Sequence, residues 1–249
     1  MLFSIITVTY NASQWIERTV QSVISQSYPQ IEYIIIDGNS TDGTLDIIKK
    51  YRQAISLCIS EPDNGLYDAM NKGLKLASGD YVWFINAGDT LGSDTTVQEI
   101  VNRFDVENLP DIIYGETQIV DSQGIPMAMR RLKAPEKLSW KSFRMGMLVC
   151  HQSFIVRRTI AEQYDLQYRF AADYDWCIRC LKKANFLFNT HLILSQFMEA
   201  GLSAANRKES LKERYRIMCR NYGKLPTQIR HVWFAIRFYT AKWTKKTVS

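Results

Sequence analysis

Long apolar runs are missing from this 249-residue sequence. No window offers the roughly 18 uninterrupted apolar residues that a membrane-spanning helix needs, so the sequence predicts no such helix. The first residues, Met1 to Val8, also lack a basic segment followed by a small-residue cleavage site. We therefore expect them to form a first strand rather than a signal peptide, and we expect a cytoplasmic protein.

Cysteine is scarce, and its spacing suits no metal site. There are five cysteines, and only Cys177 and Cys180 lie close together in the sequence. A structural zinc site needs four ligands, and no second pair completes one. Free thiols in a reducing compartment are the expectation for such scattered residues.

Two glycine-rich phosphate-binding loops are absent as well. The sequence contains neither Gly-x-Gly-x-x-Gly nor Gly-Lys-Ser/Thr. These loops let backbone N–H groups surround phosphates in dinucleotide-binding and P-loop proteins. Any nucleotide diphosphate bound here must be held in another way, and a divalent cation is the common alternative.

The charge is distributed unevenly. Residues 206–249 contain twelve Lys or Arg and two Glu, a balance of +10, whereas the formal total is +6, so residues 1–205 carry −4. The high overall pI therefore describes the end of the chain and not its body. For that reason we expect no nucleic-acid partner.

Strands and helices are predicted to alternate in the first third of the chain. β-Branched and apolar runs at 3–9, 32–37, 56–60 and 81–85 are separated by segments with apolar residues at helical spacing, at 16–24, 45–51 and 66–77. This order predicts an α/β fold with a mixed, mainly parallel sheet flanked by helices. Later segments predict antiparallel strands at 111–120 and 126–132, a strand at 150–156, a helix at 172–181, one or two strands at 186–197 and two closing basic helices.

Acidic residues follow three of the predicted strands. Asp37, Asp63 and Asp89 each come directly or almost directly after an apolar run. Since the carboxyl ends of parallel strands meet at one edge of a sheet, these groups should converge there. Carboxylate oxygens are the ligands that Mg²⁺ and Mn²⁺ prefer. Turn formation is the alternative for each of them taken singly.

Several of these motifs together resemble family 2 glycosyltransferases. The resemblance rests on Thr7-Val8-Thr9-Tyr10-Asn11, on Asp37-Gly38-Asn39-Ser40-Thr41-Asp42-Gly43-Thr44, on Asn64-Gly65, on Ala69-Met70-Asn71-Lys72-Gly73, and on Asn86-Ala87-Gly88-Asp89. It covers residues 1 to about 90 closely and 91 to about 200 loosely. It implies the GT-A fold and inverting transfer of a sugar from a nucleotide-diphosphate donor to a glycan, of the type found in bacterial surface-polysaccharide assembly.

The resemblance also implies roles for individual residues. Donor binding falls to Thr9, Tyr10, Asn11, Asp37, Ser40, Asn64, Gly65, Asn71 and Asn86, although turn and cap roles suit Ser40 equally well. Asn86 and Gly88 stand where the family usually has two aspartates. Asp89 is therefore the single carboxylate left to hold Mg²⁺ or Mn²⁺.

A second acidic element resembles the part of the family that binds the acceptor. Ala172-Asp173-Tyr174-Asp175 corresponds to its Glu-Asp element, with Ala replacing the first acid. Asp173 is thus the predicted base that accepts the proton of the acceptor hydroxyl, and Asp175 is the substitute candidate. A favourable interaction with a helix N-terminus is the other explanation for Asp173. His151 and Tyr174 are predicted to contact the diphosphate or the acceptor, with a structural histidine as the alternative.

The basic end of the chain has the composition of an interfacial helix. Lys and Arg alternate there with aromatic residues such as Trp233, Phe238 and Trp243. Such a segment suits an anionic membrane surface and a lipid-linked acceptor, whereas packing on the body is the alternative.

We expect two parts, a GT-A domain over 1–205 (donor half 1–90, acceptor half 91–205) and a basic amphipathic helical tail over 206–249. Two other functions stay open: a sugar-1-phosphate nucleotidyltransferase, and a family member that binds a nucleotide sugar without catalysis.

Overall fold

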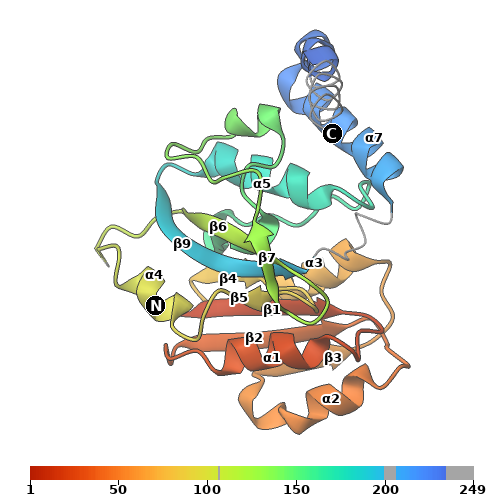
Figure 1. Ribbon diagram of the computed structural model, residues 1–249, viewed down its shortest axis with the longest axis vertical. Coiled ribbons are helices and arrows are strands. Elements are labelled where there is room, and N and C mark those ends of the chain that lie inside the picture. The colour runs from red at the N-terminus through yellow and green to blue at the C-terminus, as the bar shows by residue number, and fades with distance from the viewer. Residues whose placement is uncertain (106, 199–205, 234–249) are drawn as a thin grey trace, which may run out of the picture.

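The computed structural model describes residues 1–105, 107–198 and 206–233 (Figure 1). Within these residues nine strands form one sheet in the order β3-β2-β1-β4-β8-β6-β9-β5, and β7 pairs with β6 at the side. The sheet is mixed and has helices on both faces. This confirms the predicted fold class.

The first half of the sheet is parallel. β1 pairs with β2 and β4, and β2 pairs with β3, all in parallel register. The elements are β1 (Phe3–Thr9), α1 (Ile16–Ile24), β2 (Ile31–Asp37), α2 (Thr44–Lys50), the short 3-10 helix η1 (Arg52–Ala54), β3 (Leu57–Ser60), α3 (Leu66–Leu76) and β4 (Tyr81–Phe84). The predicted alternation of strands and helices is confirmed here, element by element.

The second half mixes strand directions. Its elements are β5 (Thr90–Leu91), α4 (Thr96–Val101), β6 (Ile112–Val120), β7 (Pro126–Met129), η2 (Ser142–Met145), η3 (His151–Ser153), β8 (Phe154–Arg157), η4 (Arg158–Ile160), α5 (Ala172–Lys183), β9 (Leu187–Met198) and α7 (Arg207–Tyr222). The predicted antiparallel pair around residues 121–124 is confirmed by β6 and β7. The strand predicted from Cys150 was wrong in its first half, because residues 151–153 turn as η3 before β8 begins.

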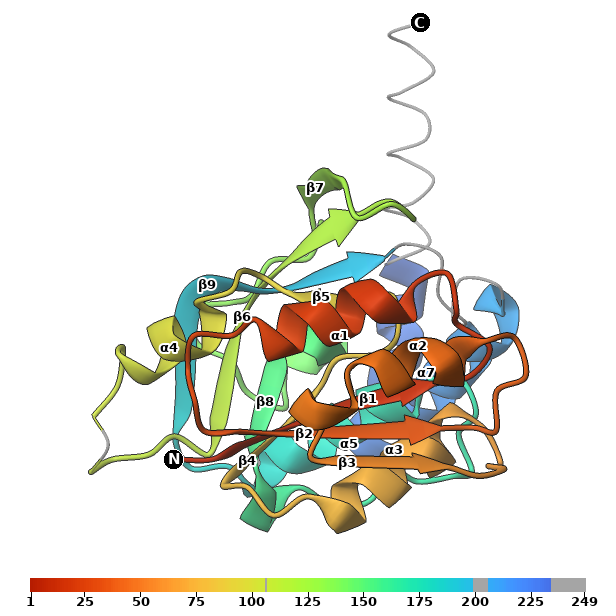
Figure 2. The same cartoon turned by 90° about the horizontal axis from the view of Figure 1, so that it is seen from below.

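Each face of the sheet buries its own apolar core. Successive strand residues point to opposite faces, so Ile6 and Ile34 belong to one core while Ile5 and Ile35 belong to the other. Helices α1, α2 and α4 cover the second core, and α3, α5 and α7 cover the first. Figure 2 shows α1 and α2 above the strands β1, β2 and β3 and the helix α3 below them, on opposite faces of the sheet.

Helix α7 packs on the body of the protein, above α5 in Figure 1. Ile217 and Met218 are buried in the same core as α3 and α5. Residues 206–222 of the predicted tail are therefore in contact with the predicted acceptor half. The part of the tail from residue 234 onward lies outside the described residues. In the ranges that the structure covers, no helix combines the length and the apolarity needed to cross a membrane.

Candidate functional site

The carboxyl ends of β1, β2 and β4 lie next to one another. Thr9, at the end of β1, is directly opposite Asp37, at the end of β2. On the other side, the backbone N–H of Ala87 donates to the carbonyl of Val8 at 3.2 Å, which places the residues after β4 beside β1. Three of the predicted donor-binding segments therefore meet at one edge of the sheet, as the strand order required.

Asp37 organises the loops at this edge. Its carboxylate is buried and accepts hydrogen bonds from the Ser40 backbone N–H at 2.9 Å and from the Ser60 hydroxyl at 2.6 Å. The Ser40 hydroxyl donates to Asp37 and accepts from the Asn11 backbone N–H. The Asn11 side chain accepts from the Thr41 N–H at 2.9 Å. Asp37, Ser40 and Asn11 thus form one hydrogen-bonded unit that sets the shape of the edge.

Two buried oxygen atoms at this edge have no hydrogen-bond partner in the described part of the protein. They are Thr9 Oγ1 and Asn86 Oδ1. Buried polar atoms are almost always hydrogen-bonded, so an unpartnered one calls for an explanation. Both lie at the ends of adjacent strands, where an α/β sheet binds its ligands. A ligand hydroxyl, N–H group or cation would satisfy them.

The turn after β4 is fastened to helix α1. Gly88 has φ of +100°, a conformation that a side chain would strain. The Thr19 hydroxyl accepts from the Gly88 N–H at 2.9 Å and donates to the Asp89 carbonyl at 2.7 Å. Arg18 donates to the Gly88 carbonyl at 2.6 Å. Helix α1 therefore holds the Asn86–Asp89 turn in place.

Asp89 connects this turn to two distant segments. One carboxylate oxygen accepts from Gln152 Nε2 at 2.6 Å, and the other accepts from the Met198 N–H at 3.0 Å. Burial raises the pKa of Asp89 to about 7, because desolvation disfavours the charged form more than these hydrogen bonds favour it. Asp89 thus joins the turn after β4 to η3 and to the end of β9.

A divalent cation would find oxygen ligands here, but few of them. No cluster of three or more His, Cys, Asp or Glu suited to a metal occurs among the described residues. Mg²⁺ commonly uses one or two carboxylates and completes its shell with substrate phosphates and water. Asp89 and the unpartnered Asn86 carbonyl oxygen fit that limited set. Binding at Asp89 would replace the hydrogen bond from Gln152 or the one from Met198.

Asp173 begins helix α5 and meets helix α3. One of its carboxylate oxygens accepts from the Tyr67 hydroxyl at 3.1 Å and from the Tyr174 N–H at 2.8 Å. The residue as a whole is half-buried. Burial and the adjacent carboxylate raise the pKa of Tyr67 well above its usual value, so this hydroxyl stays a donor. An oriented, partly accessible carboxylate of this kind suits a general base.

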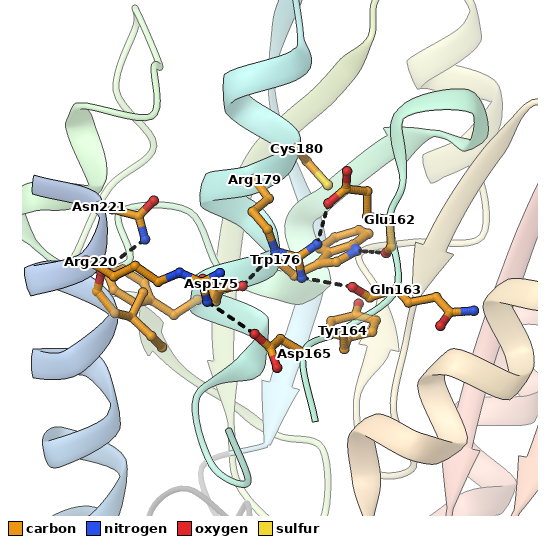
Figure 3. A network of polar contacts seen from close by, with 12 residues as sticks. Glu162, Gln163, Tyr164, Asp165, Asp175, Trp176, Arg179, Cys180, Arg220 and Asn221 are labelled. Atoms are coloured by element: carbon orange, nitrogen blue, oxygen red, sulfur yellow. Dashed lines mark hydrogen bonds and ion pairs between the residues drawn. The ribbon is translucent and has the colours of Figure 1, made fainter. Parts of the chain in front are cut away.

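Asp175, the substitute candidate, is engaged elsewhere (Figure 3). It is buried and ion-paired with Arg179 at 2.7 Å, one turn further along α5. Arg179 also bonds Glu162 at 2.8 Å and the Gln163 carbonyl at 2.9 Å. This network fixes residues 162–165 against α5. It favours Asp173 over Asp175 as the residue able to meet a substrate.

His151 lies inside an aromatic cluster behind Asp173. Its ring stacks on Phe84 with centroids 5.4 Å apart, and its Nε2 shares a 2.7 Å hydrogen bond with the Tyr164 hydroxyl. Tyr164 in turn stacks on Tyr67 at 5.5 Å. Burial lowers the pKa of His151 to about 4, so the ring is neutral at physiological pH. His151 thus holds the Tyr164 side chain, and the Tyr164 ring in turn stacks on Tyr67.

Other predicted site residues have evident structural roles. The Asn71 amide makes two hydrogen bonds to the Tyr164 backbone, at 2.7 and 3.0 Å, and so ties α3 to the 162–168 segment. Tyr174 is buried, and its hydroxyl donates to the Phe143 carbonyl. Gly65 and Asn64 begin α3, where their N–H groups bond Asp63 and Asp68. Tyr10 is 65% exposed at the end of β1 and is open to a ligand.

Sequence reasoning passed over four residues that the structure brings into the site. Tyr67 orients Asp173, Gln152 bonds Asp89, Thr19 holds the Gly88 turn, and Glu213 accepts from three backbone N–H groups just before α5. Tyr67 and Gln152 lie inside stretches already singled out, directly after Gly65-Leu66 and His151. That adjacency was the available signal.

The chain belongs to glycosyltransferase family 2. Residues 4–165 match the family model described as "Glycosyl transferase family 2". An uncharacterized glycosyltransferase of Mycobacterium tuberculosis is 32% identical over 185 residues, covering 71% of this chain and 67% of that protein. A putative teichuronic acid biosynthesis glycosyltransferase of Bacillus subtilis is 28% identical over 211 residues, covering 83% and 82%. The chain is therefore a family 2 glycosyltransferase.

Solved structures show the same fold. TarS of S. aureus, as its 1–349 fragment with UDP-GlcNAc, aligns with a TM-score of 0.66 at 21% identity, covering 91% of this chain and 69% of that one. A mannosyltransferase from Pyrobaculum calidifontis, in complex with GDP-Man and Mn²⁺, aligns with a TM-score of 0.63 at 16% identity, covering 88% and 64%. The fold of this chain is thus the GT-A fold of such enzymes.

Proposed function

We propose that this enzyme transfers a sugar, with inversion, from a nucleotide-diphosphate donor to a hydroxyl group of a glycan acceptor. The observation that supports this most is the pair of unpartnered oxygens, Thr9 Oγ1 and Asn86 Oδ1, beside the Asp37 unit at the strand ends. Each can accept a hydrogen bond from a hydroxyl group of a nucleotide or sugar. The similarity to structures holding UDP-GlcNAc and GDP-Man adds support for a nucleotide-sugar donor.

Asp173 is the proposed base of a single displacement. The acceptor hydroxyl gives its proton to the Asp173 carboxylate while its oxygen attacks the anomeric carbon. The bond from that carbon to the diphosphate breaks on the opposite face, and its electron pair leaves with the diphosphate. Tyr67 holds one oxygen of Asp173 by a hydrogen bond, and the other oxygen is left to receive the proton.

The turn containing Asp89 lies close to the same centre. Gln152 bonds Asp89, and its neighbour His151 bonds Tyr164, whose ring stacks on Tyr67, the residue that bonds Asp173. We propose that Asp89 and the Asn86 carbonyl oxygen hold a divalent cation together with the donor diphosphate. When bound, such a cation supplies positive charge to the leaving group. Donor binding by the other candidates, Tyr10, Asn11, Ser40, Asn64, Gly65 and Asn71, remains part of this proposal, with least support for Asn71.

A lipid-linked glycan of a bacterial surface polymer is the proposed acceptor. The B. subtilis relative is named for teichuronic acid biosynthesis, which supports this class. A groove of about 490 Å³ near the C-terminal end of the described chain is lined by Met145, Leu225, Pro226, Ile229, Arg230 and Trp233. Apolar side chains with basic neighbours suit an anionic lipid surface. We propose that the cytoplasmic enzyme attaches there.

Donor hydrolysis by the purified chain tests the central claim. Nucleotide sugars carrying uridine, guanosine or thymidine diphosphate are incubated with the enzyme, with and without Mn²⁺, and the released diphosphate is measured. We expect one class to be cleaved, Asp173→Asn to lose at least about a hundredfold in rate, and Tyr67→Phe to lose less. Full activity in Asp173→Asn would refute the base. Binding without any cleavage would favour the non-catalytic alternative, whereas family membership already counts against a nucleotidyltransferase.

A further inference from the structure

Helix α7 is held against the candidate base by a carboxylate. Glu213 accepts hydrogen bonds from the backbone N–H groups of Arg169, Phe170 and Ala171, at 2.9, 2.8 and 2.9 Å. These are the residues just before α5, and Asp173 follows two positions later. The residues next to Glu213 on α7 therefore lie close to the N-terminal end of α5.

The neighbour that matters is Arg214. Its guanidinium carbon lies 5.7 Å from the centre of the Tyr174 ring. Its positive charge favours ionisation of the Tyr67 hydroxyl, whose pKa the Asp173 carboxylate raises, so both charged groups are within electrostatic reach of one hydroxyl. Arg214 and Asp173 do not form an ion pair with each other. A cation from α7 therefore lies at the start of α5 without pairing with the Asp173 carboxylate.

Arg214 has no anionic partner in the part of the chain that the structure describes. Its Nε atom is buried without a hydrogen bond, and the side chain is half-buried. Other cations of α7 are paired, as Arg220 is with Asp165 and Lys212 with Glu209, or exposed to solvent, as Arg216 is. Removing a guanidinium from water without a counter-ion is unfavourable, and the Tyr174 ring offsets only part of that cost. The Arg214 guanidinium is thus left without a counter-ion among the described residues.

We infer that Arg214 binds a phosphate or diphosphate group of a substrate, next to the carboxylate that accepts the proton. The planar, five-donor guanidinium matches phosphate oxygens, and the hydrogen bonds it makes to them are charge-assisted. The state of Asp89 strengthens the inference. It is the single carboxylate of the Asn86–Asp89 turn, and both its oxygens are already hydrogen-bonded, so a protein cation is the other source of positive charge for a diphosphate. The inference rests on the proposed function. Two substrates contain such a group, the nucleotide donor and a lipid-diphosphate acceptor.

Binding measurements on matched variants separate these sources. UDP, GDP and farnesyl diphosphate, a soluble prenyl diphosphate, are titrated calorimetrically into the wild-type enzyme and into Arg214→Gln, Arg214→Lys and Arg216→Gln. Arg216→Gln removes the same charge from an exposed position on the same helix. We expect Arg214→Gln to weaken one ligand class about tenfold or more, Arg214→Lys to weaken it less, and Arg216→Gln to match the wild type. Loss of nucleotide binding identifies the donor, and loss of farnesyl diphosphate binding identifies the acceptor.

The outcomes that overturn the inference are equally distinct. Wild-type affinity of Arg214→Gln for all three ligands would refute it, as would equal losses in Arg214→Gln and Arg216→Gln. Arg214→Lys serves as the test variant if Arg214→Gln fails to fold. If the wild-type enzyme binds neither UDP nor GDP, uridine and guanosine donors are excluded, and farnesyl diphosphate alone then decides the role of Arg214.

Discussion

At the scale of single residues, Asp89 combines two properties that oppose each other. Its carboxylate is the proposed cation ligand, yet burial raises its pKa to about 7. A cation binds the deprotonated form, so protons compete with it near neutral pH. The unfolded chain has no such burial, and there the group ionises near pH 4.

The stability of the folded state should record this difference. Because the pKa of Asp89 is raised in the folded state, its contribution to the free energy of unfolding is fully present below the unfolded pKa. That contribution is lost as the pH rises through 7. We expect the melting temperature of the wild-type protein to fall relative to that of Asp89→Asn between pH 5 and pH 8. Differential scanning calorimetry of both proteins across this range makes the comparison. Parallel curves would show that Asp89 does not titrate there.

The location of single residues was predictable where position in the chain implies position in space. Asp37 ends β2 and Asp89 lies in the turn after β4, and the ends of neighbouring parallel strands converge whatever the side chains do. Tyr67 was missed because its partner Asp173 lies 106 residues away, and Gln152 was missed because Asp89 lies 63 residues away. No pattern within a short stretch of sequence indicates a hydrogen bond between residues so far apart. His151 was selected by residue type, but its surroundings are apolar rings, which sequence alone does not reveal.

At the scale of elements, the contact between α7 and α5 depends on Glu213. Three consecutive N–H groups precede a helix, where the backbone cannot satisfy them, and one carboxylate from another helix accepts all three. The Arg220–Asp165 ion pair and the Tyr222 hydroxyl bond to the Trp140 carbonyl hold the rest of α7 (Figure 3 includes the former). The start of α5, and with it Asp173, is positioned from α7.

Replacing Glu213 with Gln should loosen this contact. A glutamine keeps one accepting oxygen and loses the charge, which leaves partly buried N–H groups less well satisfied, at a cost of up to about 1–3 kcal/mol. We expect faster hydrogen–deuterium exchange in the segment 166–174 and a lower melting temperature. Glu209→Gln, on the exposed side of α7, is the control and should change neither. Unaltered exchange in Glu213→Gln would show that α7 docks without this carboxylate.

The sequence indicated a helix at α7 but not its contacts. Only Ser210, Ile217 and Met218 are buried on it, a stripe too narrow to stand out in a run rich in Lys and Arg. The contacts of α7 with the rest of the protein are mainly polar, and polar contacts leave no regular spacing in the sequence. The same limit applies to η3, where the side chains of His151 and Gln152 turn toward partners that the apolar pattern cannot show.

At the scale of the whole molecule, charge and apolar surface gather at one end. Leu225, Ile229 and Val232 are at least 60% exposed on the helical segment 224–233, and Met145 faces the same groove. Lys141, Arg144 and Lys182 surround the nearby Trp140 ring. Basic residues near an anionic membrane each contribute about 1 kcal/mol to binding.

Vesicle flotation tests the proposed membrane contact. We expect the wild-type protein to float with vesicles containing phosphatidylglycerol and to stay behind with neutral phosphatidylcholine. The double change Leu225→Ser with Ile229→Ser should reduce flotation several-fold, since both apolar anchors are lost. Leu211→Ser, an exposed leucine of α7 outside the groove, is the control. Equal flotation of the double variant and the wild type would place the membrane contact elsewhere.

The overall architecture was predictable because hydrophobic period and element order constrain it strongly. The parallel half emerged from alternating apolar runs, and the antiparallel half only in outline, since its strands pair across long and irregular connections. The division expected at residue 205 is still a prediction. The packing of α7 shows that the segment directly after it contributes to the core.

The N-terminus lies at the amino end of β1, where the Met1 amino group donates to Gln30 at 2.7 Å. Parallel strands place that edge opposite the edge that holds Thr9, Asp37 and Asn86. The groove and Arg214 both belong to the last part of the chain. An affinity tag or fluorescent label intended for activity or lipid-binding assays therefore belongs at the first residue, away from both the proposed substrate-binding edge and the basic helices.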